Sequence, residues 1–223
     1  MYDPGPGARQ RSEQAYPAPS AMTAVGTFSK LAALCFLFIA SLLFPWPAGP
    51  LSGGALLASL LLWTLGAMRI DAFGKSISVL IPLSVLLAGW GYRHPAVPFA
   101  AHHPGILIIS VGCVVLALSV ALFVHTRRLI RVTPRLNAQS FGALLVVAFG
   151  GSLLLPKAFY AVPCLYAGPP LELVFAGLVW FVATLQMICN LDDMAREIAR
   201  GAPRYREWQV AMMLFLYMVM VFI

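Results

Sequence analysis

About seven long apolar runs alternate along the chain with short polar segments. They cover residues 31–44, 54–68, 76–90, 105–124, 141–155, 171–188 and 208–223. The apolar positions in each run are continuous and do not alternate as they would in the strands of a transmembrane barrel. A helix that crosses a bilayer core needs about 20 residues, and the fourth run has that length without a charged residue. The pattern predicts an all-α, polytopic integral membrane protein with about seven transmembrane helices.

The segments between the runs divide the chain into a tail and one helical domain. Residues 1–27 are rich in Pro, Gly, Ser and Ala, and we expect them to form a disordered cytoplasmic tail. We expect residues 28–223 to form a helical transmembrane domain, with a proline kink at Pro82 in its third helix. Within this domain a loop is predicted at 91–104 and a charged connector at 194–207.

The composition agrees with a membrane protein and not with a soluble one. The chain is 61% hydrophobic and 10% charged, whereas soluble domains carry about 25% charged residues. If the N-terminus is cytoplasmic and every run crosses, all of the 15 Lys and Arg residues except Arg93 and Lys157 fall on the cytoplasmic side. The positive-inside rule predicts such an asymmetry, and it explains the net charge of +7 without a nucleic-acid partner.

Two adjacent acids, Asp192 and Asp193, lie where the sixth run meets the charged connector. In one interpretation they form an ion latch, which arginines hold closed and acidification releases. In the other they belong to a solvated helix end and pair with Arg196 at helical spacing. Gln186 and Asn190 are four residues apart, so we expect them to share a helix face that extends polarity from the acids into the membrane. Both interpretations stay open.

The other polar residues have simpler explanations. Glu172 opens the sixth run, where a carboxylate suits a helix N-terminus. The arginines between 127 and 135 could bind anionic lipid, but the cytoplasmic charge excess already explains them. We predict no metal site, no cofactor and no catalytic residue, because no ligand spacing, CxxC pair or catalytic motif is present. The residues considered and set aside are the loop histidines His94, His102 and His103, the interfacial His125, and the small residues Gly150, Gly151 and Ser152.

The last third of the chain resembles the Bax inhibitor family, the seven-span proteins that share the transmembrane Bax inhibitor motif. From Leu173 the sixth run is uncharged up to its acidic step, a connector with four arginines follows, and Glu207-Trp208 opens the closing run. In this resemblance only Asp192 and Asp193 match acids of the family's pH-sensitive calcium-leak latch. The family's second acid, in the last span, falls on Tyr217 in this chain.

The resemblance implies a cation leak, with calcium homeostasis and cell-death control as the wider role. Its partners would be the lipid bilayer, calcium ion and other membrane proteins. Two alternatives have different tests: a non-catalytic subunit or modulator should co-purify with a fixed partner, and a lipid-modifying membrane enzyme should turn over lipid. The residues do not separate an internal membrane from the cell surface.

Overall fold

The computed structural model describes residues 21–45, 54–55, 58–59, 61–62, 76–102, 105–154 and 170–222. This part of the chain is all-helical, as predicted, apart from one isolated bridge between Ala21 and Pro203. The second predicted run, 54–68, lies largely outside the described residues. The named helices are α2 (Ala24–Leu43), α5 (Ile77–His102), α6 (Ile106–Thr126), α7 (Pro134–Leu154), α9 (Pro170–Ala199) and α10 (Arg206–Phe222).

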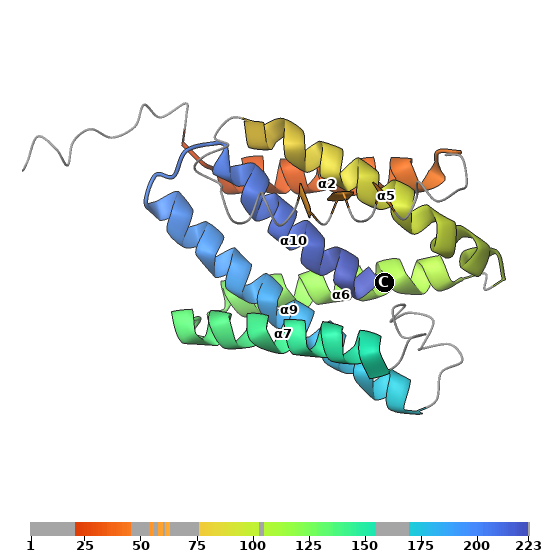
Figure 1. Ribbon diagram of the computed structural model, residues 1–223. Coiled ribbons are helices and arrows are strands. Elements are labelled where there is room, and N and C mark those ends of the chain that lie inside the picture. Colours follow the sequence, from red (N-terminus) through yellow and green to blue (C-terminus); the bar gives the residue numbers. More distant parts are fainter. Residues whose placement is uncertain are drawn as a thin grey trace, which may run out of the picture.

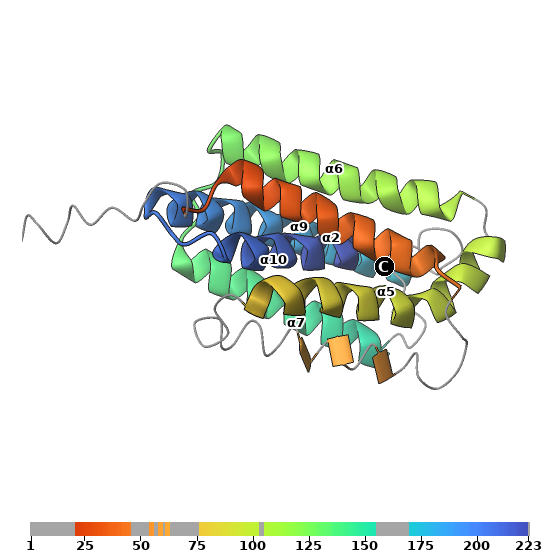
Figure 2. The ribbon, with the colours of Figure 1, turned by 90° about the horizontal axis from the view of Figure 1, so that it is seen from above.

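Helix α10 lies at the centre of the bundle and contacts α2, α5, α6 and α9 (Figures 1 and 2). Helices α2 and α5 pack against each other, and α9 joins α6 and α7 to the centre. Phe215 of α10 meets the edge of Phe38 of α2 at a ring-centroid distance of 5.4 Å. Phe38 also contacts Tyr92 of α5 at 6.2 Å, so one aromatic cluster connects three helices.

The outer helices expose apolar side chains that water would not tolerate in such numbers. Phe36 of α2, Ile108 of α6 and Phe181 of α9 are each more than half exposed. Within the described residues, three helices are long and apolar enough to cross a membrane: Ala24–Leu43, Ile108–Thr126 and Val174–Ala199. A helix that is apolar on all sides and exposed on one is suited to lipid. The described structure therefore supports an integral membrane protein.

Small residues mark the places where helices approach most closely. Ala117 and Ala121, four residues apart on α6, are fully buried, whereas Val115, Leu116 and Phe123 of the same helix are more than half exposed. A methyl group added to Gly89 of α5 would lie 2.7 Å from Cβ of Ser41 and 2.9 Å from the carbonyl oxygen of Phe38. Close approach of this kind replaces the hydrophobic effect as the means of joining helices in lipid.

The boundaries of α6 and α10 agree with prediction to within two residues, but α9 does not end where expected. The predicted helix stopped at residue 188 with a connector from 194, whereas α9 runs without interruption to Ala199. Its end is marked by Gly201, which has a φ of +68°. The amide of Ala202 donates to the carbonyl of Glu197, and that of Gly201 to Ile198, both at 3.0 Å. This is the hydrogen-bond pattern of a Schellman motif.

Three other helices are also longer than predicted. Helix α5 continues through most of the predicted loop at 91–104, as far as His102. Within this continuation Arg93 joins α5 to the end of α2 by donating to the carbonyls of Leu42 and Phe44. Helix α7 begins at Pro134, seven residues before the predicted start. Helix α2 begins at Ala24, inside the segment 1–27 predicted as tail, and residues 1–20 lie outside the described residues.

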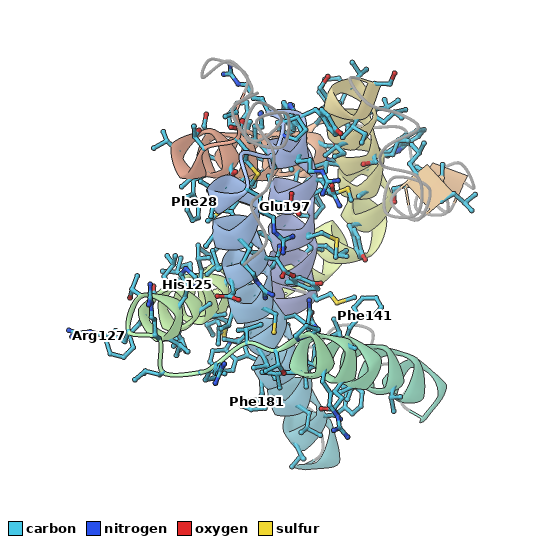
Figure 3. All side chains as sticks on the ribbon, turned by 90° about the vertical axis from the view of Figure 1, so that its left-hand side faces the viewer. Phe28, His125, Arg127, Phe141, Phe181 and Glu197 are labelled. Carbon is cyan, nitrogen blue, oxygen red and sulfur yellow. The ribbon has the colours of Figure 1, made fainter. Side chains whose placement is uncertain are left out.

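One end of the bundle carries two arginine-containing connectors, 127–133 and 200–205. Helices α6 and α9 end there, and α2, α5, α7 and α10 begin there (Figure 1). We refer to it as the basic end. Figure 3 looks onto this end and shows His125 and Arg127 of the α6 terminus to one side of Glu197. The charge pattern required both connectors at one end, and the helix directions agree with it.

Candidate ionic site at the basic end

Asp192 and Asp193 lie inside α9, almost two turns before its end. One nitrogen of Arg196, Nη2, lies 2.7 Å from Oδ2 of Asp192 and 3.0 Å from Oδ1 of Asp193. These are the helical pairings expected of a solvated helix end. Each acid and the arginine is more than a third exposed, so each pair contributes only about 0.3–0.5 kcal/mol.

Asp193 has a second partner that distinguishes it from Asp192. Nδ2 of Asn137, in the first turn of α7, donates to Oδ2 of Asp193 at 3.0 Å. The Asp193 carboxylate therefore joins α9 to α7, in addition to its pairing within α9. A hydrogen bond to a charged group is worth about 1.5–3 kcal/mol, several times an exposed ion pair.

Below Asp193 the polar contact between α7 and α9 continues into the bundle. Nε2 of Gln186, a fully buried side chain, donates to Oγ of Ser140 at 2.8 Å and to the carbonyl of Asn137 at 3.3 Å. Asn190 instead donates to the carbonyl of Val210 in α10 at 3.3 Å. Gln186 and Asn190 were expected to share one face, but they point to different neighbours, so only Gln186 extends the polarity from Asp193.

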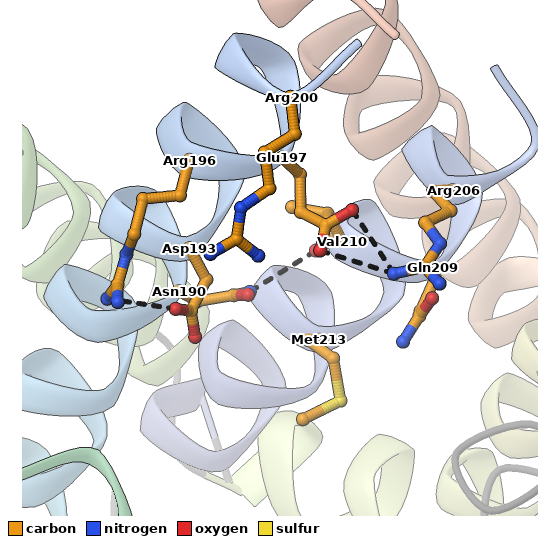
Figure 4. Close-up of a pocket in the computed structure, with 9 residues that line it drawn as sticks. All are labelled: Asn190, Asp193, Arg196, Glu197, Arg200, Arg206, Gln209, Val210 and Met213. Carbon is orange, nitrogen blue, oxygen red and sulfur yellow. Dashed lines mark hydrogen bonds and ion pairs between the residues drawn. The ribbon is translucent and has the colours of Figure 1, made fainter. Parts of the chain in front are cut away.

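Asp193 and Arg196 line two cavities, one between α9 and α7 and one between α9 and α10. One, of about 390 Å³, lies toward α7 and includes Pro134, Asn137 and Phe141. The other, of about 380 Å³, lies toward α10 (Figure 4). The Asp193–Arg196 ion pair thus belongs to the lining of both cavities at the basic end.

A second ion pair at this end joins α10 to α2, the last and the first of the described helices. Glu207 opens α10 with a side chain only 1% exposed, and its carboxylate accepts a bond from Nζ of Lys30 in α2. The backbone amide of Thr23 donates to Oε1 of Glu207 at 2.8 Å, and the Thr23 hydroxyl donates to it at 3.2 Å. A methyl group on Gly26 would overlap this carboxylate. Lys30 also lies 5.4 Å from the ring centre of Trp208, a cation–π distance.

Glu207 precedes the apolar part of α10 and stays charged because of these contacts. Burial alone would raise the pKa of its carboxyl. Hydrogen bonds from Lys30 and Thr23, together with the Lys30 charge, outweigh burial and hold the pKa below its usual value. Nearby, the amide of Met22 donates to the carbonyl of Ala202 at 2.8 Å. The start of the helical domain is therefore fixed to the α9–α10 connector.

A third ion pair connects the last turn of α9 with the first residue of α10. Nη1 of Arg206 lies 3.2 Å and 3.1 Å from the two carboxylate oxygens of Glu197.

Of the other residues considered from the sequence, the arginines at 127, 128, 131 and 135 are exposed on and beside the α6–α7 connector. The side chains of Glu172, His94, His102, His103, Gly150, Gly151 and Ser152 lie outside the described residues.

Neither the Asp193–Asn137 contact nor the Glu207–Lys30 contact could be predicted from the sequence. Their partners are 56 and 177 residues apart, so helical spacing could not pair them. A local signal did exist for one of them: Thr133 and Pro134 form a helix start, with Oγ1 of Thr133 accepting from the amide of Leu136 at 3.1 Å. That start places Asn137 in the first turn of α7.

An all-helical bundle with lipid-facing apolar surfaces and an ionic cluster at one end defines a polytopic helical membrane protein. A sequence model of the family described as "Bax inhibitor 1 like" matches residues 5–223, almost the whole chain. The protein therefore belongs to the Bax inhibitor 1 like family, as the last third of the sequence indicated. No curated protein and no solved structure matches the chain.

Proposed function

We propose that this protein is an acid-responsive cation leak, with calcium as its cation and Asp193 as the latch acid. The observation that carries the proposal is the double attachment of Asp193, to Arg196 in its own helix and to Asn137 in α7. The basic end is taken to face the cytoplasm, because it collects the Lys and Arg residues. Membership of the Bax inhibitor 1 like family supports the assignment. Calcium homeostasis and cell-death control would be its wider role.

The proposed latch operates by removing one negative charge. With the Asp193 carboxylate ionised, Arg196 and Asn137 hold it, and α7 stays against α9 at the basic end. Protonation of Asp193 cancels the ion pair and weakens the bond from Asn137, since a neutral carboxyl is a poorer acceptor than a carboxylate. The contact between α7 and α9 loosens at the basic end, and cations pass between the cavities.

The proposed latch has one acid, whereas the family's latch has a second acid in the last span. The position that would hold the family's second acid is Tyr217, which is buried in α10. In this chain the group opposite Asp193 is the Asn137 amide, which does not titrate. We therefore expect a single proton to open the latch.

Flux through the purified protein in liposomes, measured with a trapped calcium dye, tests the proposal. Flux should rise as the pH at the basic end falls, and Asp193→Asn should give high flux that no longer depends on pH. Asp192→Asn is the matched control: it removes the same charge from a neighbouring residue that also pairs with Arg196. It should keep the pH response, because Asp193 still accepts from Asn137.

Two results would remove the proposal. One is the absence of flux from the unmodified protein at any pH. The other is an equal response from the Asp193→Asn and Asp192→Asn variants, which would show that net charge and not attachment to α7 controls the flux.

A further inference from the structure

The cavity between α9 and α10 contains more hydrogen-bond donors than acceptors. Its volume is about 380 Å³, and its charged and polar lining includes Asp193, Arg196, Glu197, Arg200, Arg206 and Gln209 (Figure 4). Both carboxylates are already occupied, Asp193 by Arg196 at 3.0 Å and Glu197 by Arg206 at 3.1 Å. Asp192 also forms an ion pair with Arg196, but it is not one of the residues that line the cavity.

The donors, in contrast, are in surplus. Arg200 makes no ion pair with any residue that the structure describes. Figure 4 shows its guanidinium extending into the cavity between Asp193 and Glu197. Nε of Arg196 is buried and has no acceptor within the described parts of the chain. The two lining carboxylates already have partners, and Arg200 has no ion-pair partner among the described residues, so the cavity is suited to a ligand that supplies acceptor oxygens.

We infer that this cavity binds a phosphate group, with Arg200 as its principal contact. A phosphate offers several acceptor oxygens and negative charge, which matches the Arg200 guanidinium extending from α9 and the Gln209 amide of α10 in the same lining. Val210 and Met213 provide an apolar margin below the polar groups. The site lies at the end of a membrane-embedded bundle, where phospholipid headgroups are found. The bound phosphate group can therefore belong to a lipid phosphomonoester or to free inorganic phosphate.

The test measures the thermal stability of the purified full-length protein in detergent as each probe is added. A ligand that binds only the folded state raises the melting temperature with concentration. The probes are dioctanoyl phosphatidic acid, dioctanoylglycerol as the same lipid without phosphate, and sodium phosphate against sodium chloride at equal ionic strength. This assay does not measure flux. A negative result would therefore overturn phosphate binding and leave the latch proposal standing, and a negative flux result would leave phosphate binding standing.

Saturable stabilisation by phosphatidic acid but not by dioctanoylglycerol is the expected result. Arg200→Gln should weaken it at least about ten-fold, because a charge-assisted bond is lost, and Arg200→Lys should retain part of it. Arg131→Gln is the matched control: it removes the same charge from an exposed residue of the other connector and should change nothing. Equal stabilisation by sodium phosphate would identify free phosphate as the source.

The inference is overturned if no phosphate-bearing probe stabilises the protein. It is also overturned if Arg200→Gln binds as tightly as the unmodified protein, or if Arg131→Gln weakens binding as much as Arg200→Gln. The melting temperature of each variant without probe shows whether it is folded.

Discussion

The buried Glu207–Lys30 pair should contribute much more to stability than the other ion pairs at the basic end. Glu207 is 1% exposed and Lys30 is 15% exposed, and the carboxylate also accepts from the amide and hydroxyl of Thr23. Removing one member of a buried pair costs about 3–5 kcal/mol when the other is left fully buried. Lys30 keeps some access to solvent, and a glutamine oxygen could still accept from Thr23. We therefore expect Glu207→Gln to cost about 2–3 kcal/mol.

That loss is large enough to measure by thermal unfolding in detergent. For a chain of this size each kcal/mol shifts the melting temperature by about 2–4 °C, so Glu207→Gln should lower it by about 4–12 °C. The matched control is Glu197→Gln, which breaks the more exposed pair with Arg206 and should cost less than about 1 kcal/mol. Combining Glu207→Gln with Lys30→Met should recover part of the loss, because no unpaired charge remains.

The result that would refute this reasoning is an equal shift for Glu207→Gln and Glu197→Gln. Burial would then make no difference to what an ion pair contributes to the free energy of unfolding. A further loss on adding Lys30→Met would also contradict it, since it would show that Lys30 stabilises the protein without Glu207.

Two other predictions concern the same packing. Because the pKa of Glu207 is lower in the folded protein than its unfolded value of about 4.3, its contribution is complete above that pH and is lost as the pH falls through the folded pKa. The gap in melting temperature between the unmodified protein and Glu207→Gln should therefore narrow as the pH falls below that unfolded value, and a constant gap would exclude the pair as its cause. Gly89→Ala should lower the melting temperature, because the new methyl group would lie 2.7 Å from Cβ of Ser41; Gly112→Ala in α6, whose methyl group meets nothing within 4 Å, should leave it unchanged or raise it slightly.

The membrane class and the central span of most helices could be predicted from the sequence, because lipid imposes continuous apolar runs. The helix ends could not be placed from charge alone. Met194 to Ala199 is charged but consists of residues compatible with a helix, so α9 continues through it. The informative signals were Gly201 and Pro203, a helix stop followed by a residue that cannot continue it.

The two acids of the candidate latch could be found from the sequence, but not the difference between them. Their shared pairing with Arg196 follows from helical spacing alone. The contact of Asp193 with Asn137 depends on how α7 packs against α9, and no local pattern encodes that packing. The same reason hides the Lys30–Glu207 pair, whose partners come from the first and the last described helix.

The distance between the basic ends of α7 and α9 tests the central claim most directly. Spin labels at Arg135 and Ala195, both exposed, can be attached after the native cysteines are replaced, and their separation measured by double electron–electron resonance. A longer distance at acidic than at neutral pH, with Asp193→Asn already long at neutral pH and Asp192→Asn unchanged, is the result predicted. A distance that ignores both pH and the Asp193→Asn substitution would contradict the latch.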